Sequence, residues 1–372
     1  MLAMDRKNQW TCSPKCSSPW ALWWIVVAMQ AMILAAGRST RLGSIGLALP
    51  KPLLPVCGYP AITYGIELCR RAGLHNIVIN LHHHGDKIGQ TLGDGSRFGV
   101  RLRYSVEEEL LGTGGALWKA RPMFSPGPVL VMNGKVAADI DLDTVLAAHR
   151  AAPQGTVATM VVREDPSPEL WAPLGVDVTG AVLSIRGKHA NGAATGPLLP
   201  RMFVGIHIVE PALLDRLPEG VSDVIGDAYI PALLAGNRIA SLTMKGYFAE
   251  HSTPERYLAG NIDLLRHPTF LPQAPGALVG IDASAQVDAS AQICTPVRIA
   301  AGAIVEAGAV VGPLTVVCSG GRVASGAQIA RSVVWPEATA SGKHSGVVFT
   351  PGGVYVAETA PNPINLPSGS PS

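Results

Sequence analysis

In the first two thirds of the chain, short apolar runs alternate with segments in which apolar residues recur at helical spacing. Short runs that are apolar throughout are typical of central strands in a parallel sheet. Such strands, separated by amphipathic helices, predict an α/β fold. The predicted strands are residues 32–35, 76–81, 129–132 and 157–163, and also residues 100–104, where apolar and polar residues alternate. The predicted helices are residues 60–72, 86–92, 142–150, 211–217, 224–234 and 255–265.

After residue 276 the hydrophobic pattern changes to a period of six. A small or β-branched residue stands four positions after each aliphatic one, and Trp335 continues the aliphatic phase. A period of six fits neither a helix nor a flat sheet, but it fits a hexapeptide β-helix of about three coils. The repeat contains no candidate catalytic histidine, so we expect a structural or subunit-contact role. The aliphatic positions are Ile281, Val287, Ile293, Ile299, Val305, Val311, Val317, Val323 and Ile329.

These patterns divide the chain into five parts. Residues 1–28 are an N-terminal extension, 29–266 the α/β domain, 267–276 a proline-rich linker, 277–342 the β-helix and 343–372 a tail rich in Pro, Gly and Ser. Four of the seven tryptophans lie in the extension, and no charge occurs from Trp20 to Gly37. About 18–20 apolar residues would cross a bilayer, but the run at 32–35 cannot be both membrane span and sheet strand. We therefore favour a mis-assigned start, with the working chain beginning at Met29 or Met32.

Charge and cysteine content exclude several classes of partner. The formal net charge is only +2, which gives no electrostatic case for binding nucleic acid or an anionic membrane. The six cysteines are scattered and form no disulfide framework. We expect a cytoplasmic protein whose partners are small molecules.

The stretch Met32–Val56 carries the strongest candidate chemistry. A strand runs into a loop of small residues, and two cations, Arg41 and Lys51, follow. Backbone N–H groups of such a loop can face an anion while the cations neutralise it. The residues themselves therefore predict a phosphate site.

The same stretch resembles the signature of the sugar-1-phosphate nucleotidyltransferases. Leu34–Gly37, Thr40–Leu42 and Pro50–Pro55 match it with the spacing intact, whereas Ser39 replaces its second glycine. The resemblance implies a Rossmann-like nucleotidyltransferase domain followed by a left-handed β-helix, most like mannose-1-phosphate guanylyltransferases. It also implies a reaction in which a nucleoside triphosphate and a sugar 1-phosphate give a nucleotide-sugar and pyrophosphate. The β-helix could additionally join subunits of a homo-oligomer.

The resemblance assigns roles to particular residues. Arg41 and Lys51 would be catalytic. A tight turn is the alternative for the glycine loop at 112–115, and a solvated loop lysine is the alternative for Lys188. The nucleotide-binding candidates are Leu34, Ala35, Ala36, Gly37, His83, Gly112, Thr113 and Gly114, and the sugar-phosphate candidates are Gly175, Lys188 and Gly205.

The chain departs from the family at the expected Mg²⁺ site. Two aspartates hold the metal in the family, but Lys135 stands at one position and Glu250 at the other. Mg²⁺ typically uses one or two protein carboxylates, so this change is serious. Three hypotheses stay open: an active enzyme in which Lys135 partly substitutes for the metal, a binding or regulatory homologue with little turnover, and an acyltransferase acting through the β-helix. Asp139, Asp141 and Asp143 follow closely, but nothing requires them to reach the metal position.

Overall fold

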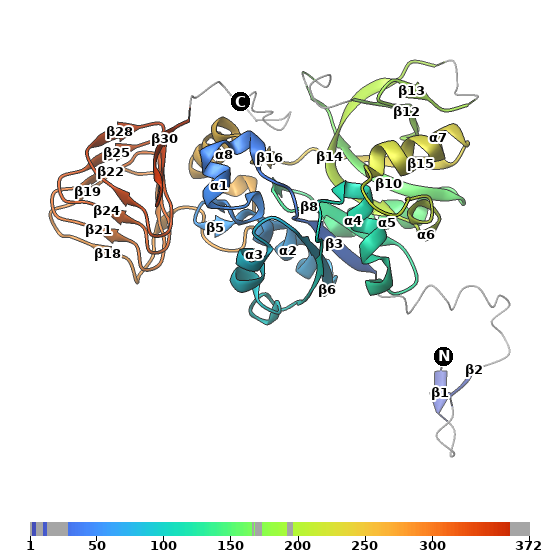
Figure 1. Ribbon diagram of the computed structural model, residues 1–372, viewed down its shortest axis with the longest axis horizontal. Coiled ribbons are helices and arrows are strands. Elements are labelled where there is room, and N and C mark those ends of the chain that lie inside the picture. Colours follow the sequence, from blue (N-terminus) through green and yellow to red (C-terminus); the bar gives the residue numbers. More distant parts are fainter. Residues whose placement is uncertain are drawn as a thin grey trace.

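The computed structural model describes residues 29–357 except 166, 168–172 and 192–195, together with the backbone of two short strands, β1 (Leu2–Met4) and β2 (Trp10–Cys12), which pair antiparallel. The rest of the predicted extension, and the tail beyond residue 357, lie outside the described residues. A β-helix occupies one end of the molecule and an α/β domain the other, with the helix α8 (Pro254–Arg266) between them (Figure 1). No helix among the described residues is long and apolar enough to cross a membrane.

A mixed sheet of ten strands forms the centre of the α/β domain. Its order is β13-β12-β11-β14-β8-β3-β6-β7, and β10 pairs with both β14 and β15. The strands β8, β3, β6 and β7 are mutually parallel, as the apolar runs of β3, β6 and β8 predict. The strands are β3 (Gln30–Leu34), β6 (Asn76–Leu81), β7 (Arg101–Val106), β8 (Val129–Asn133), β10 (Thr156–Arg163), β11 (Leu174–Val176), β12 (Val182–Ile185), β13 (Lys188–His189), β14 (Leu199–Val209) and β15 (Arg238–Thr243).

Helices cover both faces of this sheet, which explains why its central strands are apolar on every side. Ile33 of β3 packs into the same core as Ile62 of α2, whereas its neighbour Met32 packs with Leu117 of α4 on the opposite face. Successive strand residues point to opposite faces, so both must be apolar. The α-helices are α1 (Ser44–Ala48), α2 (Ala61–Arg71), α3 (Gly85–Leu92), α4 (Gly112–Ala120), α5 (Leu142–Ala151), α6 (Pro211–Leu214), α7 (Ile230–Leu234) and α8.

One predicted helix is shorter than expected, and another has its full predicted length but is not α-helical throughout. The helix predicted over residues 211–217 ends at Leu214, and the one predicted over 224–234 begins as the π-helix η7 (Val224–Tyr229) before α7. The remaining short elements are η2 (Thr40–Leu42), η3 (Lys51–Leu53), η4 (Ser96–Phe98), η5 (Arg121–Met123), η8 (Pro268–Phe270), β4 (Pro55–Val56), β5 (Tyr59–Pro60), β9 (Val136–Ala138) and β16 (Phe248–Glu250).

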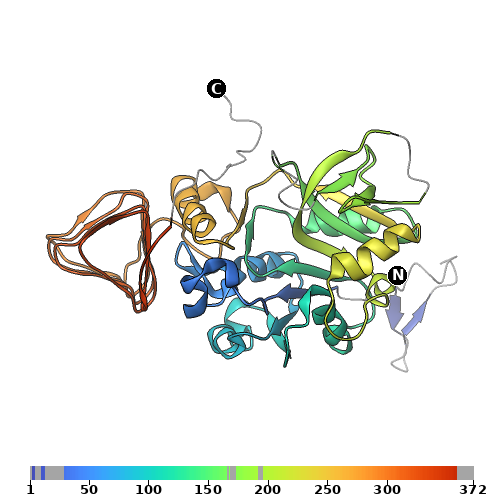
Figure 2. The same ribbon diagram turned by 45° about the horizontal axis from the view of Figure 1, so that its top comes forward.

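The second part of the chain is a β-helix with a triangular cross-section, seen end-on in Figure 2. Its three sides are parallel sheets in the orders β17-β20-β23-β26-β29, β18-β21-β24-β27 and β19-β22-β25-β28. Partner residues are 18 positions apart in the first coils, for example Ile281 and Ile299, which equals three hexads per coil. The strands are β17 (Gly280–Ile281), β18 (Gln286–Val287), β19 (Gln292–Ile293), β20 (Val297–Ile299), β21 (Ile304–Val305), β22 (Val310–Val311), β23 (Thr315–Val317), β24 (Arg322–Val323), β25 (Gln328–Ala330), β26 (Val333–Val334), β27 (Thr339–Ala340), β28 (Lys343–Ser345), β29 (Val347–Thr350) and β30 (Gly353–Val356).

The β-helix continues past residue 342, where the sequence places the start of the tail. The spacing between coils falls from 18 to 17 residues at the pair Val317–Val334, and to 15 at the pair Val333–Val348. These shorter coils break the period of six, so the hexad pattern no longer reveals them. The same shift puts Val334, and not Trp335, in register with the aliphatic Val317. Four coils and the closing antiparallel pair β29–β30 result, in place of about three coils.

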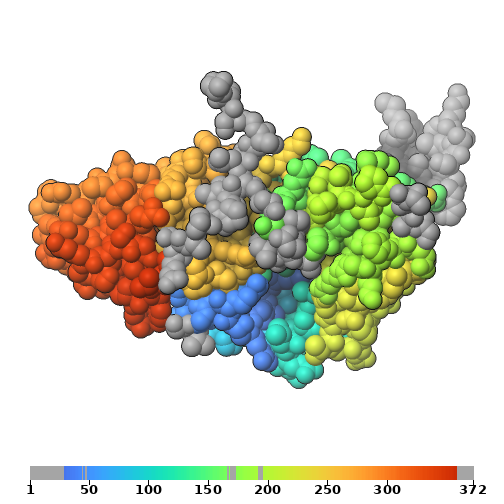
Figure 3. Space-filling view, turned by 90° about the horizontal axis from the view of Figure 1, so that it is seen from above, coloured from blue at the N-terminus to red at the C-terminus, as the bar shows by residue number. Residues whose placement is uncertain are grey.

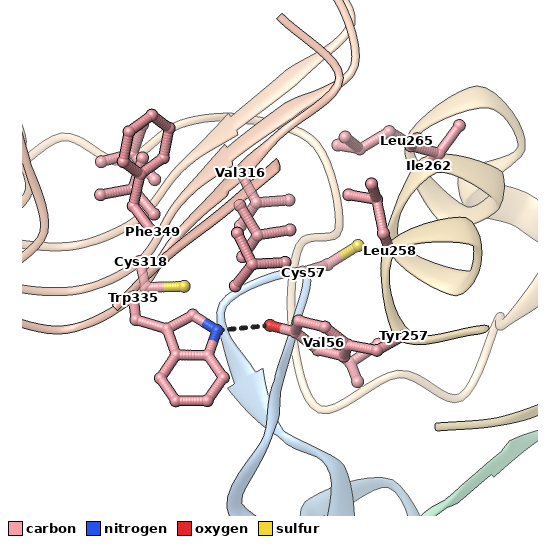
Figure 4. Close-up of a cluster of buried hydrophobic side chains, with 14 of the residues drawn as sticks. Val56, Cys57, Tyr257, Leu258, Ile262, Leu265, Val316, Cys318, Trp335 and Phe349 are labelled. Carbon is pink, nitrogen blue, oxygen red and sulfur yellow. Dashed lines mark hydrogen bonds between the residues drawn. The ribbon is translucent and has the colours of Figure 1, made fainter. Parts of the chain in front are cut away.

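One continuous apolar core joins the β-helix to α8 and to the segment after the phosphate loop. The indole of Trp335 lies against this joint, and its Nε1 donates to the hydroxyl of Tyr257 at 2.9 Å (Figure 4). That hydroxyl donates in turn to the carbonyl of Pro55 at 2.7 Å. In the space-filling view the β-helix, coloured orange to red, lies directly beside α8 and the blue N-terminal part of the α/β domain (Figure 3). The chain between Arg266 and β17 is packed too, since Leu271 and Leu278 belong to this core.

Two buried histidines predict acid sensitivity of the fold. Burial lowers the pKa of His207 to about 3, and burial lowers that of His251 to about 4 despite opposing interactions with Lys135 and Glu250. The unfolded chain, with histidine pKa values near 6.5, binds these protons first, so stability is full above pH 6.5 and falls as pH drops towards 4. Each histidine contributes up to about 1.4 kcal/mol per pH unit in that window. Urea titrations at several pH values should show this slope, and His207→Gln should reduce it; an equal slope in that variant would contradict the assignment.

Candidate functional site

A cavity of about 340 Å³ opens at the carboxyl ends of the parallel strands β3, β6 and β8. This edge is where open α/β sheets commonly bind ligands. Four cationic side chains line the cavity, and no carboxylate is among its lining residues in the described part of the chain. The charge therefore favours an anionic ligand. The lining residues are Leu34, Ala35, Ala36, Gly37, Arg38, Ser39, Thr40, Arg41, Lys51, Pro52, Asn80, Leu110, Gly112, Thr113, Asn133 and Lys135.

Ser39 determines how the predicted phosphate loop closes on the catalytic candidate Lys51. Ser39 has a left-handed backbone, with φ of 58°, which explains why glycine is expected at this position. Its hydroxyl oxygen Oγ accepts a hydrogen bond from the backbone N–H of Lys51 at 3.0 Å, a contact that glycine could not make. The loop and Lys51, 12 residues apart, are thereby held together. The sequence marks Ser39 only as a departure from the family pattern and does not reveal this contact.

Lys51 is a partly desolvated cation. Burial, then the charge of Lys135 and that of Arg41, lower its pKa to about 8, while Glu250 acts in the opposite direction. An incoming polyphosphate would replace the lost water and neutralise the repulsion between these cations. The Lys51 ammonium is therefore poised to gain from anion binding.

Lys135 and Glu250, the two departures from the expected metal site, form an ion pair between Nζ and Oε1. The strands β9 and β16 pair antiparallel with Val136 opposite Glu250, and this register brings the two side chains together. Arg41 lies 3.8 Å from the same carboxylate oxygen, and Arg256 lies 3.3 Å from the other. Burial alone would raise the pKa of Glu250, but Lys135 and the two arginines hold it below its usual value.

The aspartates that follow Lys135 make their contacts elsewhere than at Glu250. Ala138 pairs with Phe248 at the other end of β9, and the backbone of Asp139 then bonds to Tyr247. Asp141 caps α5 by accepting from the N–H of Asp143. No group of three or more His, Cys, Asp or Glu side chains that could hold a metal ion occurs in the part of the chain that the structure describes.

A buried network that the sequence does not reveal supports the cavity floor. Asn80 at the end of β6 accepts from the N–H of Ala35 at 2.8 Å and donates to Glu107 at 2.7 Å. Glu107 is 3% exposed, and it also accepts from the N–H of Leu111 at 3.0 Å. Two segments that both contribute residues to the cavity lining are thus tied together. The only sequence signal was an amide in a short apolar strand and a glutamate in an acidic run.

The glycine loop has two faces with different roles. Gly112 and Thr113 line the cavity, whereas Gly114 does not. A Cβ on Gly114 would lie 2.6 Å from Oγ of Ser222, and a Cβ on Gly115 would lie 2.1 Å from the carbonyl oxygen of Gly220. These two glycines therefore permit close packing against residues 220–224. This packing explains why glycine stands at both positions, and no ligand contact is needed to explain it.

The other predicted site residues lie outside the cavity lining. Lys188 is exposed on β13, and Gly175 packs against Leu198 and Ser184. Gly205, with φ of +76°, lies where a Cβ would be 2.1 Å from the side chain of Asn133, a lining residue. The ring of His83 is tilted by 50° against that of the neighbouring His84, with ring centroids 4.0 Å apart. Their assignment to nucleotide or sugar stays a prediction.

The chain is similar in sequence to several nucleotidyltransferases. The nucleotidyl transferase family matches residues 30–188. An N-acetylmuramate alpha-1-phosphate uridylyltransferase of Neisseria meningitidis is 42% identical over 52% of this chain and 80% of its own length. A UTP--glucose-1-phosphate uridylyltransferase of Synechocystis is 34% identical over 55% of each chain. A mannose-1-phosphate guanylyltransferase of Mycobacterium tuberculosis is 28% identical over 64% of this chain and 65% of its own length. The alignments thus span between about half and two thirds of the last two relatives.

Solved structures share the fold. HddC from Yersinia pseudotuberculosis, crystallised in complex with GMP-PN, superposes with a TM-score of 0.52 at 21% identity, over 62% of this chain and 97% of HddC.

Proposed function

The chain belongs to the nucleotidyl transferase family, and from this premise we propose that it transfers a nucleotidyl group from a nucleoside triphosphate to a sugar 1-phosphate, releasing pyrophosphate. The observation that carries the proposal is the cavity at the strand ends, with its cationic lining and its closure by the Ser39–Lys51 hydrogen bond. Mannose 1-phosphate with guanosine triphosphate, and glucose or N-acetylmuramate 1-phosphate with uridine triphosphate, are the pairs that the relatives suggest.

The proposed chemistry needs positioning and charge neutralisation more than covalent assistance. A phosphate oxygen of the sugar 1-phosphate attacks the α-phosphorus in line, and the bond from that phosphorus to the bridging oxygen breaks as pyrophosphate leaves with the electron pair. Arg41 and Lys51 neutralise the triphosphate, and Gly112 with Thr113 faces the base. Lys188, Gly175 and Gly205 remain our candidates for the sugar phosphate.

Members of the family generally use a divalent metal, but the residues at the expected Mg²⁺ position do not fit that ion. Mg²⁺ requires oxygen ligands in octahedral geometry. Here the single carboxylate, Glu250, contacts Lys135 and two arginines, and Lys135 replaces the other ligand with a cation. We therefore derive no step through a protein-held metal.

The proposal is tested by a pyrophosphate-release assay with the panel of pairs named above, with and without Mg²⁺. We expect release with at least one pair, together with a nucleotide-dependent rise in melting temperature. If nucleotide raises the melting temperature but no pair turns over, the binding or regulatory hypothesis replaces the enzyme hypothesis. If neither occurs, the proposed site is wrong.

A further inference from the structure

The contact between Lys135 and Glu250 is built into the backbone. Two strands fix it, because Val136 next to Lys135 pairs with Glu250 across β9 and β16. His251, which follows Glu250, also contacts Lys135. Its backbone N–H donates to the carbonyl of Lys135 at 3.2 Å, and its ring Nδ1 lies 3.2 Å from that oxygen. The ring is fully buried, so the backbone of Lys135 is held in place from the opposite strand.

Both carboxylate oxygens of Glu250 lie near cationic side chains. Lys135 and Arg41 face Oε1, and Arg256 faces Oε2. The Glu250 side chain is 8% exposed and does not line the cavity, whereas Lys135 and Arg41 do. The two cations therefore lie between the carboxylate and the space where the ligand would bind. A divalent ion could bind Glu250 only by displacing one or more of these cationic groups.

We propose that the Lys135 ammonium takes the place of a protein-held metal ion and, with Arg41 and Lys51, faces the substrate phosphates, and that the chain itself holds no divalent ion at Glu250. Glu250 is then a positioning residue, which fixes the ammonium at the cavity wall and neutralises part of the repulsion among the surrounding cations. The anion recognised is a nucleoside polyphosphate, and this identification rests on the proposed function. Any divalent ion in the reaction would arrive bound to the nucleotide and would be part of the substrate.

A tethered cation differs from a bound metal in what it contributes. An ammonium donates three hydrogen bonds and carries one charge at a fixed place. A divalent ion would carry twice the charge and could bind phosphate and carboxylate oxygens together. Lys135 therefore keeps electrostatic stabilisation of the phosphates, but it makes the affinity for nucleotide independent of a metal held by the protein.

Titration of the full-length protein with Mn²⁺ alone, followed by the electron paramagnetic resonance of free Mn²⁺, tests the inference. We expect no Mn²⁺ site at Glu250 in the wild type. The variant Lys135→Asp restores a second carboxylate and should bind Mn²⁺ at least about tenfold more tightly than the wild type, and the further change Glu250→Gln should remove that gain. Lys343→Asp, an equal change of charge at an exposed position of the β-helix, is the matched control and should bind no more Mn²⁺ than the wild type.

Two outcomes would overturn the inference. The first is a wild-type protein that binds Mn²⁺ and loses it on Glu250→Gln, a comparison that does not depend on the folding of Lys135→Asp. The second is a folded Lys135→Asp variant that gains no Mn²⁺ site, because then Lys135 is not what keeps divalent ions from Glu250.

Measuring nucleotide affinity tests the inference independently. It also distinguishes a failure of this inference from a failure of the proposed nucleotidyl transfer. Wild-type affinity for a nucleoside triphosphate should change by less than about threefold between chelator and Mn²⁺, whereas the affinity of Lys135→Asp should depend on Mn²⁺. A wild type whose affinity requires Mn²⁺ and loses that requirement on Glu250→Gln would contradict the inference. Absence of any nucleotide binding would instead refute the proposed function, while the titration with Mn²⁺ alone would still decide whether Lys135 occupies the cation position.

Discussion

Lys51→Met is expected to lower kcat/KM for nucleotidyl transfer by about 10²–10³-fold, the usual effect of removing one electrostatic donor from a preorganised site. The substitution removes a half-buried ammonium held beside Lys135 and Arg41. Because the substitution relieves the repulsion between Lys51 and these two cations, the free energy of unfolding should not fall. Steady-state kinetics and urea denaturation together measure the effect. Lys343→Met, which removes an exposed lysine of the β-helix, is the control and should leave kcat/KM unchanged.

The same lysine predicts how nucleotide affinity depends on pH. Burial and the two neighbouring cations put the Lys51 pKa at about 8 in the free protein, and a bound polyphosphate raises it. Below pH 8 the lysine is protonated in both states, so it adds no pH dependence. Above pH 8, binding must take up a proton, and affinity should fall by up to about tenfold per pH unit. Lys51→Arg stays protonated and should lack this fall; an identical pH profile in both proteins would contradict the assignment.

Trp335→Ala should lower the free energy of unfolding by about 3–5 kcal/mol, the range for truncating a large buried aromatic side chain. The indole is 2% exposed, and its Nε1 bonds to the hydroxyl of Tyr257 at the joint between the β-helix and α8. Truncation leaves a cavity there and leaves the Tyr257 hydroxyl with only its bond to Pro55. Urea denaturation measures the change.

Two further variants separate the parts of this effect. Tyr257→Phe removes the hydroxyl alone and leaves Trp335 Nε1 unpaired, so we expect a loss of about 1–3 kcal/mol. Val354→Ala on β30 removes an aliphatic group that is 46% exposed and should change stability by no more than about 0.5 kcal/mol. If Trp335→Ala were no more disruptive than Val354→Ala, the continuous core between the two parts would not stabilise the molecule.

Local patterns in the sequence were enough to predict most of the architecture. The runs of apolar residues that became β3, β6, β8 and β10 were predicted as strands because a strand buried on both faces must be apolar throughout. The period of six predicted the β-helix for as long as each coil kept 18 residues. In the site, the order of strand, loop of small residues and following cations predicted a phosphate site, and Arg41, Lys51 and this loop do line one cavity.

Tertiary structure decided the pairings that give this cavity its character. Lys135 and Glu250 are 115 residues apart, and only the register of β9 on β16 brings their opposite charges into contact. From the sequence alone, Lys135 is interpreted as the loss of a metal ligand. The strand register shows it to be a cation held at the cavity wall. Ser39 likewise reads as a departure until its hydroxyl is seen to hold Lys51. Local periodicity in a sequence predicts which segments form strands and helices. Contacts between distant segments depend on strand register and packing, which no local pattern encodes.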